Sequence, residues 1–172
     1  MPAVFLVGLM GAGKTTVGRL LARALHSEFV DTDHVIEDRT GVSIRTIFEI
    51  EGEAGFRLRE SAIIDELTQH VDIVLATGGG AVMDPVNRSH LHERGVVIYL
   101  CATPEILYQR TRGDRGRPLL QVEDRLGKLR SLHSQRDPLY REIAHLVVEV
   151  GHAQATQVVR RIQESLPGTC AN

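Results

Sequence analysis

One short stretch near the N-terminus, GLMGAGKTT from Gly8 to Thr16, restricts the possible folds more than any other part of the sequence. It satisfies the pattern G-x-x-x-x-G-K-[ST] through Gly8, Gly13, Lys14 and Thr15. The apolar run AVFLV precedes it and a helical pattern follows, which is the strand–loop–helix context that this pattern requires. A merely structural glycine-rich turn is the alternative. The stretch predicts a loop that wraps the phosphates of a nucleotide.

The rest of the chain alternates between apolar runs and helical patterns. The runs are AVFLVG, EFVDTD, DIVLATGGG, GVVIYLCA and HLVVEV, and their continuous apolar character predicts strands buried on both faces of a parallel sheet. Helices are expected over 14–25, 43–70 with an interruption near Gly52, 84–94, 103–112, 123–133 and 153–166. We therefore expect one domain over 1–172 with a three-layer α/β fold of the P-loop NTPase type and about five parallel strands.

Composition narrows the class of protein further. No run approaches the roughly 18 apolar residues of a membrane helix, and the N-terminus lacks the features of a signal peptide, so we expect a cytoplasmic protein that does not bind membranes. The net charge of −2 argues against a nucleic-acid partner. Residues 110–141 nevertheless hold nine basic and four acidic side chains. That excess suits either a solvated helical face or a region that closes over an anionic small molecule.

The phosphate-binding loop implies specific chemistry for its side chains. Lys14 is one of only two lysines in a chain with twenty basic residues, and its compact charge on a flexible stem suits a phosphate better than an arginine fork would. The hydroxyl of Thr15 is placed to bind Mg²⁺. These features identify a nucleotide and leave the acceptor of its phosphate open.

Two carboxylates follow the second apolar run, in FVDTD. Alternate residues of a strand share a face, so Asp31 and Asp33 are expected on the same side, at the sheet edge where ligands collect. Asp31 is expected to hold the magnesium shell through water, and Asp33 to orient or deprotonate a substrate hydroxyl. An acidic cap for a helix starting near Thr32 is the alternative for Asp33.

Further candidates lie in three other segments. The run TGGG, residues 77–80, predicts bare backbone that a ligand can approach. Arg57 and Glu60 are three apart on one helical face, so the carboxylate either positions the guanidinium or forms a surface ion pair with it. Arg136 is expected just before a proline turn, and Arg117 in the loop RGDRGRPLL, which interrupts the helical pattern and is expected to be mobile.

Together these segments closely resemble the shikimate kinase family. The matching elements are GLMGAGKTTVGR, FVDTD, TGVSI, FRLRE, TGGGAV, RPLL and RDPLY, in that order and spacing, and they span about three quarters of the chain. The first element is generic to P-loop proteins, whereas the series from DTD to RDPLY is specific. The resemblance implies transfer of a phosphoryl group from ATP to the 3-hydroxyl of shikimate, a step toward chorismate and the aromatic amino acids.

The resemblance also implies roles for individual residues. The catalytic set is Lys14, Asp33 and Arg117, with Arg117 on a lid over roughly 113–124. Shikimate is expected on Asp33, Arg57, Gly79, Gly80 and Arg136, with Glu60 behind Arg57. The metal is expected on Thr15 with Asp31 behind it, and ATP on Gly11, Ala12, Gly13, Lys14, Thr15, Thr16, Arg110, Arg117 and Gln154. Many relatives carry an arginine near adenine where this chain has GHAQAT, and Gln154 is the expected substitute.

Three other functions compete with this interpretation. Gluconate kinases have a similar loop but lack the series from DTD to RDPLY, and nucleoside monophosphate kinases would need a pocket for a second base. A nucleotide-binding regulatory module without turnover would have no reason to keep Lys14, Asp33 and the three arginines together. We expect the small molecules ATP and shikimate as partners, and a monomer.

Overall fold

The computed structural model describes residues 2–166, and its centre is a five-stranded parallel sheet in the order β2-β3-β1-β4-β5. The strands are β1 (Val4–Val7), β2 (Glu28–Asp31), β3 (Ile73–Ala76), β4 (Val96–Cys101) and β5 (Leu146–Glu149). All five runs expected to be strands are strands. The three central strands are buried almost throughout, whereas the edge strands β2 and β5 are partly exposed. Burial on both faces was therefore correctly predicted only for the centre of the sheet.

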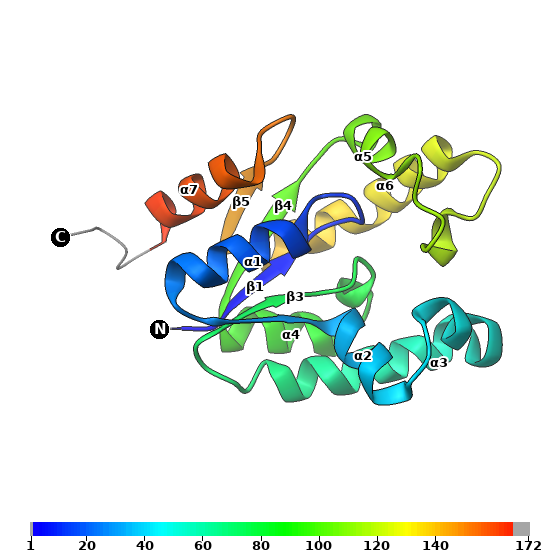
Figure 1. Cartoon of the computed structure of the whole chain (residues 1–172), viewed down its shortest axis with the longest axis horizontal. Coiled ribbons are helices and arrows are strands. Elements are labelled where there is room, and N and C mark those ends of the chain that lie inside the picture. The colour runs from blue at the N-terminus through cyan, green and yellow to red at the C-terminus, as the bar shows by residue number, and fades with distance from the viewer. Residues whose placement is uncertain (1, 167–172) are drawn as a thin grey trace.

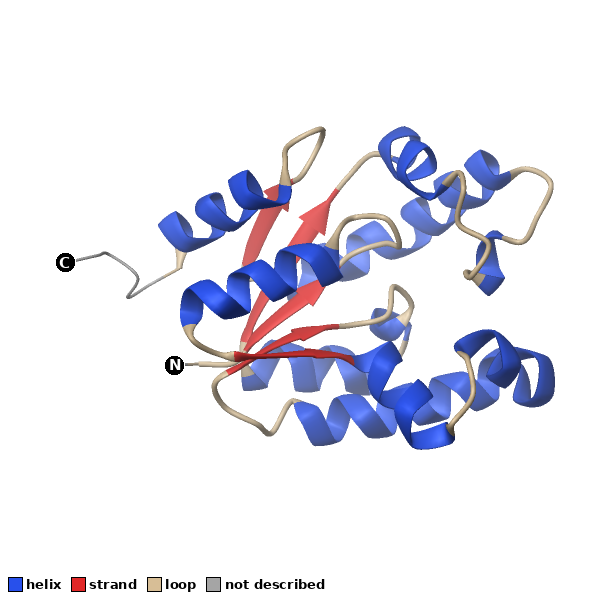
Figure 2. Ribbon diagram, viewed as in Figure 1, coloured by secondary structure: helices blue, strands red, loops and turns tan. Residues whose placement is uncertain are grey.

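Helices cover both faces of this sheet, which gives the three layers expected from the sequence (Figures 1 and 2). The helices α1 (Lys14–Leu25) and α7 (Ala155–Ser165) lie side by side on one face. The other face is covered by α4 (Pro85–Arg94) and α6 (Arg125–Ile143), with α3 (Ile44–Leu67) beyond α4. Two shorter helices, α2 (Thr32–Thr40) and α5 (Pro104–Thr111), and two 3₁₀ turns, at Ala81–Met83 and at Pro118–Leu120, complete the described chain.

Local sequence explains where several helices begin. The side chains of Asp84 and Thr103 accept hydrogen bonds from the backbone N–H groups of Val86 and Ile106, and a proline follows each at the first helical position. The expected interruption of α3 is also present, because Gly52 has a left-handed φ of 72°.

Two expectations about helices were wrong. Helix α6 does not end near His133 but runs to Ile143 with Pro138 inside it, so Arg136 lies within a helix and not before a turn. The second error concerns Asp33, which lies in the first turn of α2 and not on the strand, because β2 ends at Asp31. The Asp31 side chain accepts the N–H of Asp33 and thereby caps α2.

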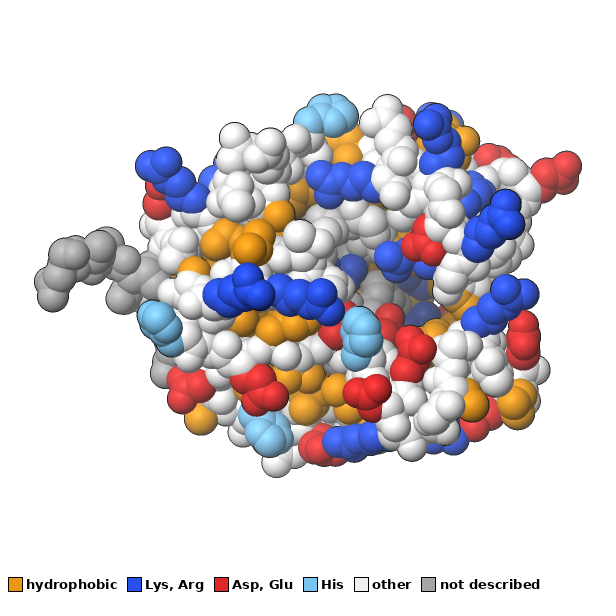
Figure 3. All heavy atoms as spheres, viewed as in Figure 1, with side chains coloured by type: hydrophobic (Ala, Val, Ile, Leu, Met, Phe, Trp, Pro, Cys, Tyr) orange, Lys and Arg blue, Asp and Glu red, His pale blue; other side chains and the backbone are white. Residues whose placement is uncertain are grey.

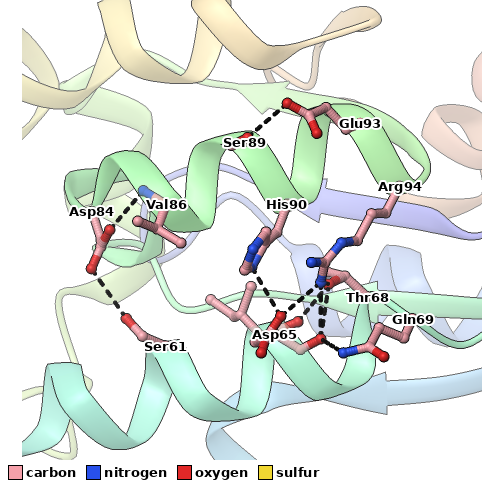
Figure 4. Close-up of polar contacts among 11 residues, drawn as sticks. Ser61, Asp65, Thr68, Gln69, Asp84, Val86, Ser89, His90, Glu93 and Arg94 are labelled. Atoms are coloured by element: carbon pink, nitrogen blue, oxygen red, sulfur yellow. Dashed lines mark hydrogen bonds and ion pairs between the residues drawn. The ribbon is translucent and has the colours of Figure 1, made fainter.

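Side-chain contacts fix α3 to α4 at both ends of their contact (Figure 4). At one end, Arg94 Nη1 donates to Asp65 Oδ1 at 2.9 Å, to the Asp65 carbonyl at 3.0 Å and to the Thr68 hydroxyl at 2.9 Å. At the other end, the Ser61 hydroxyl donates to Asp84 at 3.4 Å. These contacts hold the C-terminal half of α3, which also carries Arg57 and Glu60, against the layer that covers the sheet.

Candidate active site

A cleft of about 710 Å³ opens at the carboxyl edge of the sheet. Figure 3 shows a hollow in this face of the molecule with Lys and Arg side chains in its wall. The chain brings the phosphate-binding loop, the ends of β2 and β3, the middle of α3, the segment 114–119 and α6 to this cleft. Ligands of parallel α/β sheets bind at this edge.

The phosphate-binding loop forms one end of the cleft. Gly11 and Gly13 adopt left-handed φ values of 85° and 95°, which a side chain at these positions would strain, and α1 begins immediately after Gly13. Lys14 Nζ donates to the carbonyls of Gly8 and Leu9 at 2.6 and 3.1 Å. Burial, with a smaller contribution from Arg117, lowers the pKa of Lys14 to about 8. The converging amides and this lysine make a cationic cradle at the start of a helix.

Thr15 and Asp31 meet beside this loop. The Thr15 hydroxyl donates to Asp31 Oδ2 at 2.8 Å, while Asp31 Oδ1 accepts the N–H of Asp33. Asp33 lines the same cleft, although its position on a helix differs from the one expected. Burial and the neighbouring Asp31 raise the pKa of Asp33, and its Oδ1 is buried without a hydrogen-bond partner among the described residues.

The end of the cleft formed by α3 and α6 contains two arginines in different settings. Arg57 donates from Nη1 to Glu60 Oε1 at 2.7 Å and from Nη2 to Glu53 Oε1 at 3.3 Å. Arg136 is only 3% exposed, and within residues 2–166 no carboxylate pairs with it. Its Nε and Nη1 atoms are buried without hydrogen-bond partners in the described chain. A buried cation without an anion is costly, so this end of the cleft suits a carboxylate supplied by a ligand.

The TGGG run passes between these side chains. A Cβ at Gly80 would lie 2.2 Å from Arg57 Nη2, and one at Gly78 would lie 2.5 Å from Glu60 Oε2 and 3.2 Å from Asp33 Oδ1. Gly79 leaves ordinary room, with Arg136 Nη1 at 3.5 Å. A side chain at 78 or 80 would therefore displace Glu60 or Arg57 from its place in the cleft.

A second hollow of about 280 Å³ adjoins the phosphate-binding loop and shares Gly11, Gly13, Thr16 and Arg110 with the larger cleft. Arg110 forms part of its wall and donates to the carbonyls of Gly11, Ala12 and Gly151 at 3.2, 3.3 and 2.9 Å. Ala12 lines this hollow and not the larger cleft. Gln154 is exposed and lines neither cavity, whereas its neighbours Ala153 and Ala155 do line the hollow. The contact expected between Gln154 and adenine stays a prediction.

Comparison with known proteins decides the family. The family model described as shikimate kinase matches residues 10–167, which is most of the chain. This chain belongs to the shikimate kinase family. A shikimate kinase from Dechloromonas aromatica is 62% identical over 157 residues, which cover 91% of this chain and 86% of that protein. A solved structure of the shikimate kinase from Acinetobacter baumannii in complex with shikimate is 52% identical, superposes with a TM-score of 0.94, and covers 95% of this chain and 92% of that one.

The family assignment bears on the competing functions. A gluconokinase from Sinorhizobium meliloti superposes with a TM-score of 0.53 but is only 18% identical, over 92% of this chain and 87% of that one. That likeness shows a shared fold alone. The resemblance inferred from the motif series is therefore confirmed, as is the P-loop kinase fold.

A shikimate kinase uses ATP with a divalent metal, and the donor set beside the loop fits one. Mg²⁺ prefers oxygen ligands and is usually held by one or two protein groups together with substrate phosphates and water. The Thr15 hydroxyl and the Asp31 carboxylate supply such oxygens 2.8 Å apart. Among residues 2–166 there is no cluster of three or more metal-binding His, Cys, Asp or Glu side chains. The arrangement therefore suits a metal that arrives with the nucleotide.

Sequence reasoning missed several residues of this cleft. Phe48, Phe56, Arg45 and Asp114 line it without having been named as candidates. The rings of Phe48 and Phe56 lie 5.0 Å apart between centroids, and Asp114 accepts the Nε of Arg117 at 2.6 Å. Gly78, which also lines the cleft, was expected as part of the TGGG run. No helix in the described part of the chain is long and apolar enough to cross a membrane.

Proposed function

We propose that this chain transfers the γ-phosphoryl group of ATP to the 3-hydroxyl of shikimate and releases shikimate 3-phosphate and ADP. The observation that carries this proposal is the unpaired, buried Arg136 beside Arg57, in the same cleft as the phosphate-binding loop. One pocket is thus cationic at both ends. An anionic acceptor and a nucleoside triphosphate fit that charge distribution. Phosphoryl transfer requires little more than their alignment and the neutralisation of charge.

The end of the cleft that contains Arg57 and Arg136, here called the acceptor end, supplies each group that shikimate needs. Arg57 and Arg136 bind its carboxylate, because guanidinium groups pair with carboxylates in a planar, bidentate geometry. Asp33 accepts a hydrogen bond from the ring hydroxyls and orients the one that attacks. The backbone of Gly79 and Gly80 forms the wall on which the ring lies, and Glu60 holds Arg57 in place.

The donor end binds the triphosphate of ATP. The backbone from Gly11 to Thr16 surrounds the β- and γ-phosphates, and Lys14 compensates their charge. Mg²⁺ is held by Thr15 with Asp31 behind it, and it neutralises charge that develops on the phosphates. The nucleobase binds in the hollow of about 280 Å³, and Arg110 forms part of the wall of that hollow. The role of Gln154 at adenine stays a prediction that its exposed position does not support.

The segment 113–124 is proposed to close over the bound substrates. Arg117 lies in the wall of the cleft and is 41% exposed, with Asp114 as its ion-pair partner. Closure of this segment would carry the guanidinium onto the transferred phosphate and exclude water that competes for it.

Release of ADP with different acceptors tests this function. The chain is mixed with ATP and Mg²⁺ together with shikimate, gluconate, AMP or no acceptor. We expect release of ADP well above background only in the mixture that contains shikimate as the acceptor. Release that shikimate does not change would contradict the proposal, and release driven by gluconate or AMP would replace it. No release with any acceptor, combined with normal ATP binding, would indicate a regulatory module.

Three further statements extend this proposal. We expect one domain over the whole chain, a monomer, and a cytoplasmic location. Size-exclusion chromatography with light scattering checks the second of these.

A further inference from the structure

The two arginines at the acceptor end differ in what holds them. Arg57 is fixed by two carboxylates of its own helix, Glu60 and Glu53. For Arg136 no such carboxylate is found in the described chain, so its position follows from where α6 lies. The place of α6 relative to the TGGG run therefore sets the geometry of half of the carboxylate site.

Tyr140 connects α6 to that run. Arg136 and Tyr140 are four apart on the buried face of α6, together with Leu129, Leu132 and Ile143, so their side chains are neighbours. The Tyr140 side chain is fully buried, and its hydroxyl donates a hydrogen bond to the carbonyl of Gly79. Gly79 is also the residue whose Cβ position is 3.5 Å from Arg136 Nη1. One hydroxyl thus joins the helix that carries the arginine to the backbone that the arginine faces.

Pro138 makes this contact more important than it would be in a regular helix. A proline inside a helix has no N–H to donate to the carbonyl four residues earlier, here that of Ser134, and it bends helices. The turn of α6 from Ser134 to Pro138, which includes Arg136, therefore lacks one of the backbone bonds of a regular helix. The Tyr140 hydroxyl supplies an anchor two residues after Pro138.

We propose that Tyr140 is a positioning residue for the substrate carboxylate, because its bond to Gly79 sets where the Arg136 guanidinium lies relative to the Gly79 and Gly80 backbone. This inference rests on the proposed function, in which Arg136 binds that carboxylate. Tyr140 acts through Arg136 and does not itself touch the reacting atoms. Burial raises the pKa of Tyr140, so the hydroxyl remains a donor through the pH range of the assay.

The substitution Tyr140→Phe tests the proposal, because it removes the hydroxyl and keeps the ring. Tyr99→Phe is the matched control. Tyr99 is 1% exposed, its ring lies 4.8 Å from that of Tyr140, and its hydroxyl donates to Asp137 Oδ1 at 2.8 Å, also on α6. Both variants therefore lose one buried hydroxyl that supports α6, and only one of them loses the contact to Gly79.

We expect Tyr140→Phe to weaken shikimate binding and raise its KM by about tenfold, the loss of roughly one well-aligned contact. The KM for ATP and the Kd of ADP should change by less than about twofold. The preference for shikimate over its uncharged methyl ester should also decrease, because the Arg136 guanidinium is no longer aligned with the carboxylate of shikimate. Tyr99→Phe should keep wild-type values for all of these quantities.

Each other outcome overturns the inference. Wild-type shikimate binding in Tyr140→Phe, equal losses for shikimate and nucleotide, or the same loss in Tyr99→Phe would each assign Tyr140 a general structural role. Thermal melting with and without shikimate provides a second measurement on a variant that folds only at low temperature, and an unchanged shikimate-induced shift in Tm also counts against the proposal. If shikimate neither binds to the wild-type chain nor stimulates its release of ADP, the proposed function itself is refuted. That result is distinct from one in which the wild-type chain responds to shikimate and only the inference about Tyr140 fails.

Discussion

Glu60 holds the guanidinium of Arg57 from one turn away on α3, with 2.7 Å between Arg57 Nη1 and Glu60 Oε1. The glutamate side chain is fully buried, whereas Arg57 keeps 23% of its side chain exposed toward the cleft. Burial raises the pKa of Glu60, and the charge of Arg57 opposes that effect. An anion is thus buried behind a cation that faces the ligand.

Glu60→Gln keeps the shape of this side chain and removes its charge. We expect shikimate affinity to fall by about 1–3 kcal/mol, because the hydrogen bond that orients Arg57 loses its ionic partner. Isothermal titration with shikimate and with ADP measures the effect. Glu53→Gln is the control, since Glu53 contacts the same arginine at 3.3 Å but is 52% exposed, and exposed pairs contribute little. Equal losses in the two variants would contradict the assignment of Glu60.

Arg136→Ala removes the unpaired cation at the acceptor end. Shikimate binding should weaken by about 2–5 kcal/mol, the range for truncating one side of a desolvated charge pair. ATP affinity measured on the same variant should barely move. Arg141→Ala is the comparison on the same helix, because that side chain is 48% exposed and pairs with Asp137. If shikimate and ATP affinity fell together, Arg136 would support the fold and not the acceptor.

Gly80→Ala tests whether the TGGG run makes room for Arg57. The new Cβ would lie 2.2 Å from Arg57 Nη2, so the guanidinium must move away from its place in the cleft. We expect a clear rise in the KM for shikimate with little change for ATP. Gly79→Ala should have a smaller effect, because a Cβ there meets its nearest neighbours at 3.5 Å. A reversed order of the two variants would show that the run matters for another reason.

Asp31→Asn addresses the metal. Asparagine can still accept the N–H of Asp33 and cap α2, but it lacks the charge behind the Thr15 hydroxyl. The Mg²⁺ concentration for half-maximal activity should rise by about 10- to 100-fold, as for other groups behind a metal ligand. Asp38→Asn, on the exposed side of α2, should leave the Mg²⁺ dependence unchanged. An unchanged dependence in Asp31→Asn would remove Asp31 from the metal site.

The order of the strands, and of the α-helices apart from α2, was predictable because its signals are local. Apolar runs identify strands, and a capping side chain followed by proline marks the start of α4 and α5. The course of α6 through Pro138 was not predictable. Local preference says that a proline ends a helix, and here the contacts of α6 with Gly79 and Tyr99 hold the helix together across it.

Some parts of the candidate site were likewise predictable from local sequence, and others were not. The phosphate-binding loop and the TGGG run could be found because consecutive residues carry the signal. Asp33 was placed in the right cleft by a wrong argument, since it reaches the cleft from the first turn of α2 and not from a strand. Tyr140 lies 61 positions from Gly79, so no local pattern could show that they meet.

His145 predicts how the stability of the fold depends on pH. Its Nδ1 accepts the N–H of Val97 at 3.0 Å, and its ring stacks on His92 with 4.6 Å between centroids. His92 Nδ1 lies 3.0 Å from the carbonyl of Ile143. Burial, and then the charge of His92, lowers the pKa of His145 below its ordinary value of 6.5. Protonation of Nδ1 would also break the bond from Val97.

The unfolded chain therefore takes up this proton at a higher pH than the folded chain does. The contribution of His145 to the free energy of unfolding is fully present above pH 6.5, falls as the pH drops below that value, and stops changing below the folded pKa. Urea unfolding between about pH 5 and about pH 7.5 should show this loss. His145→Asn keeps a neutral acceptor for Val97 and should flatten the profile, whereas His152→Asn, at an exposed position, should not. Parallel profiles for the wild type and His145→Asn would refute the assignment.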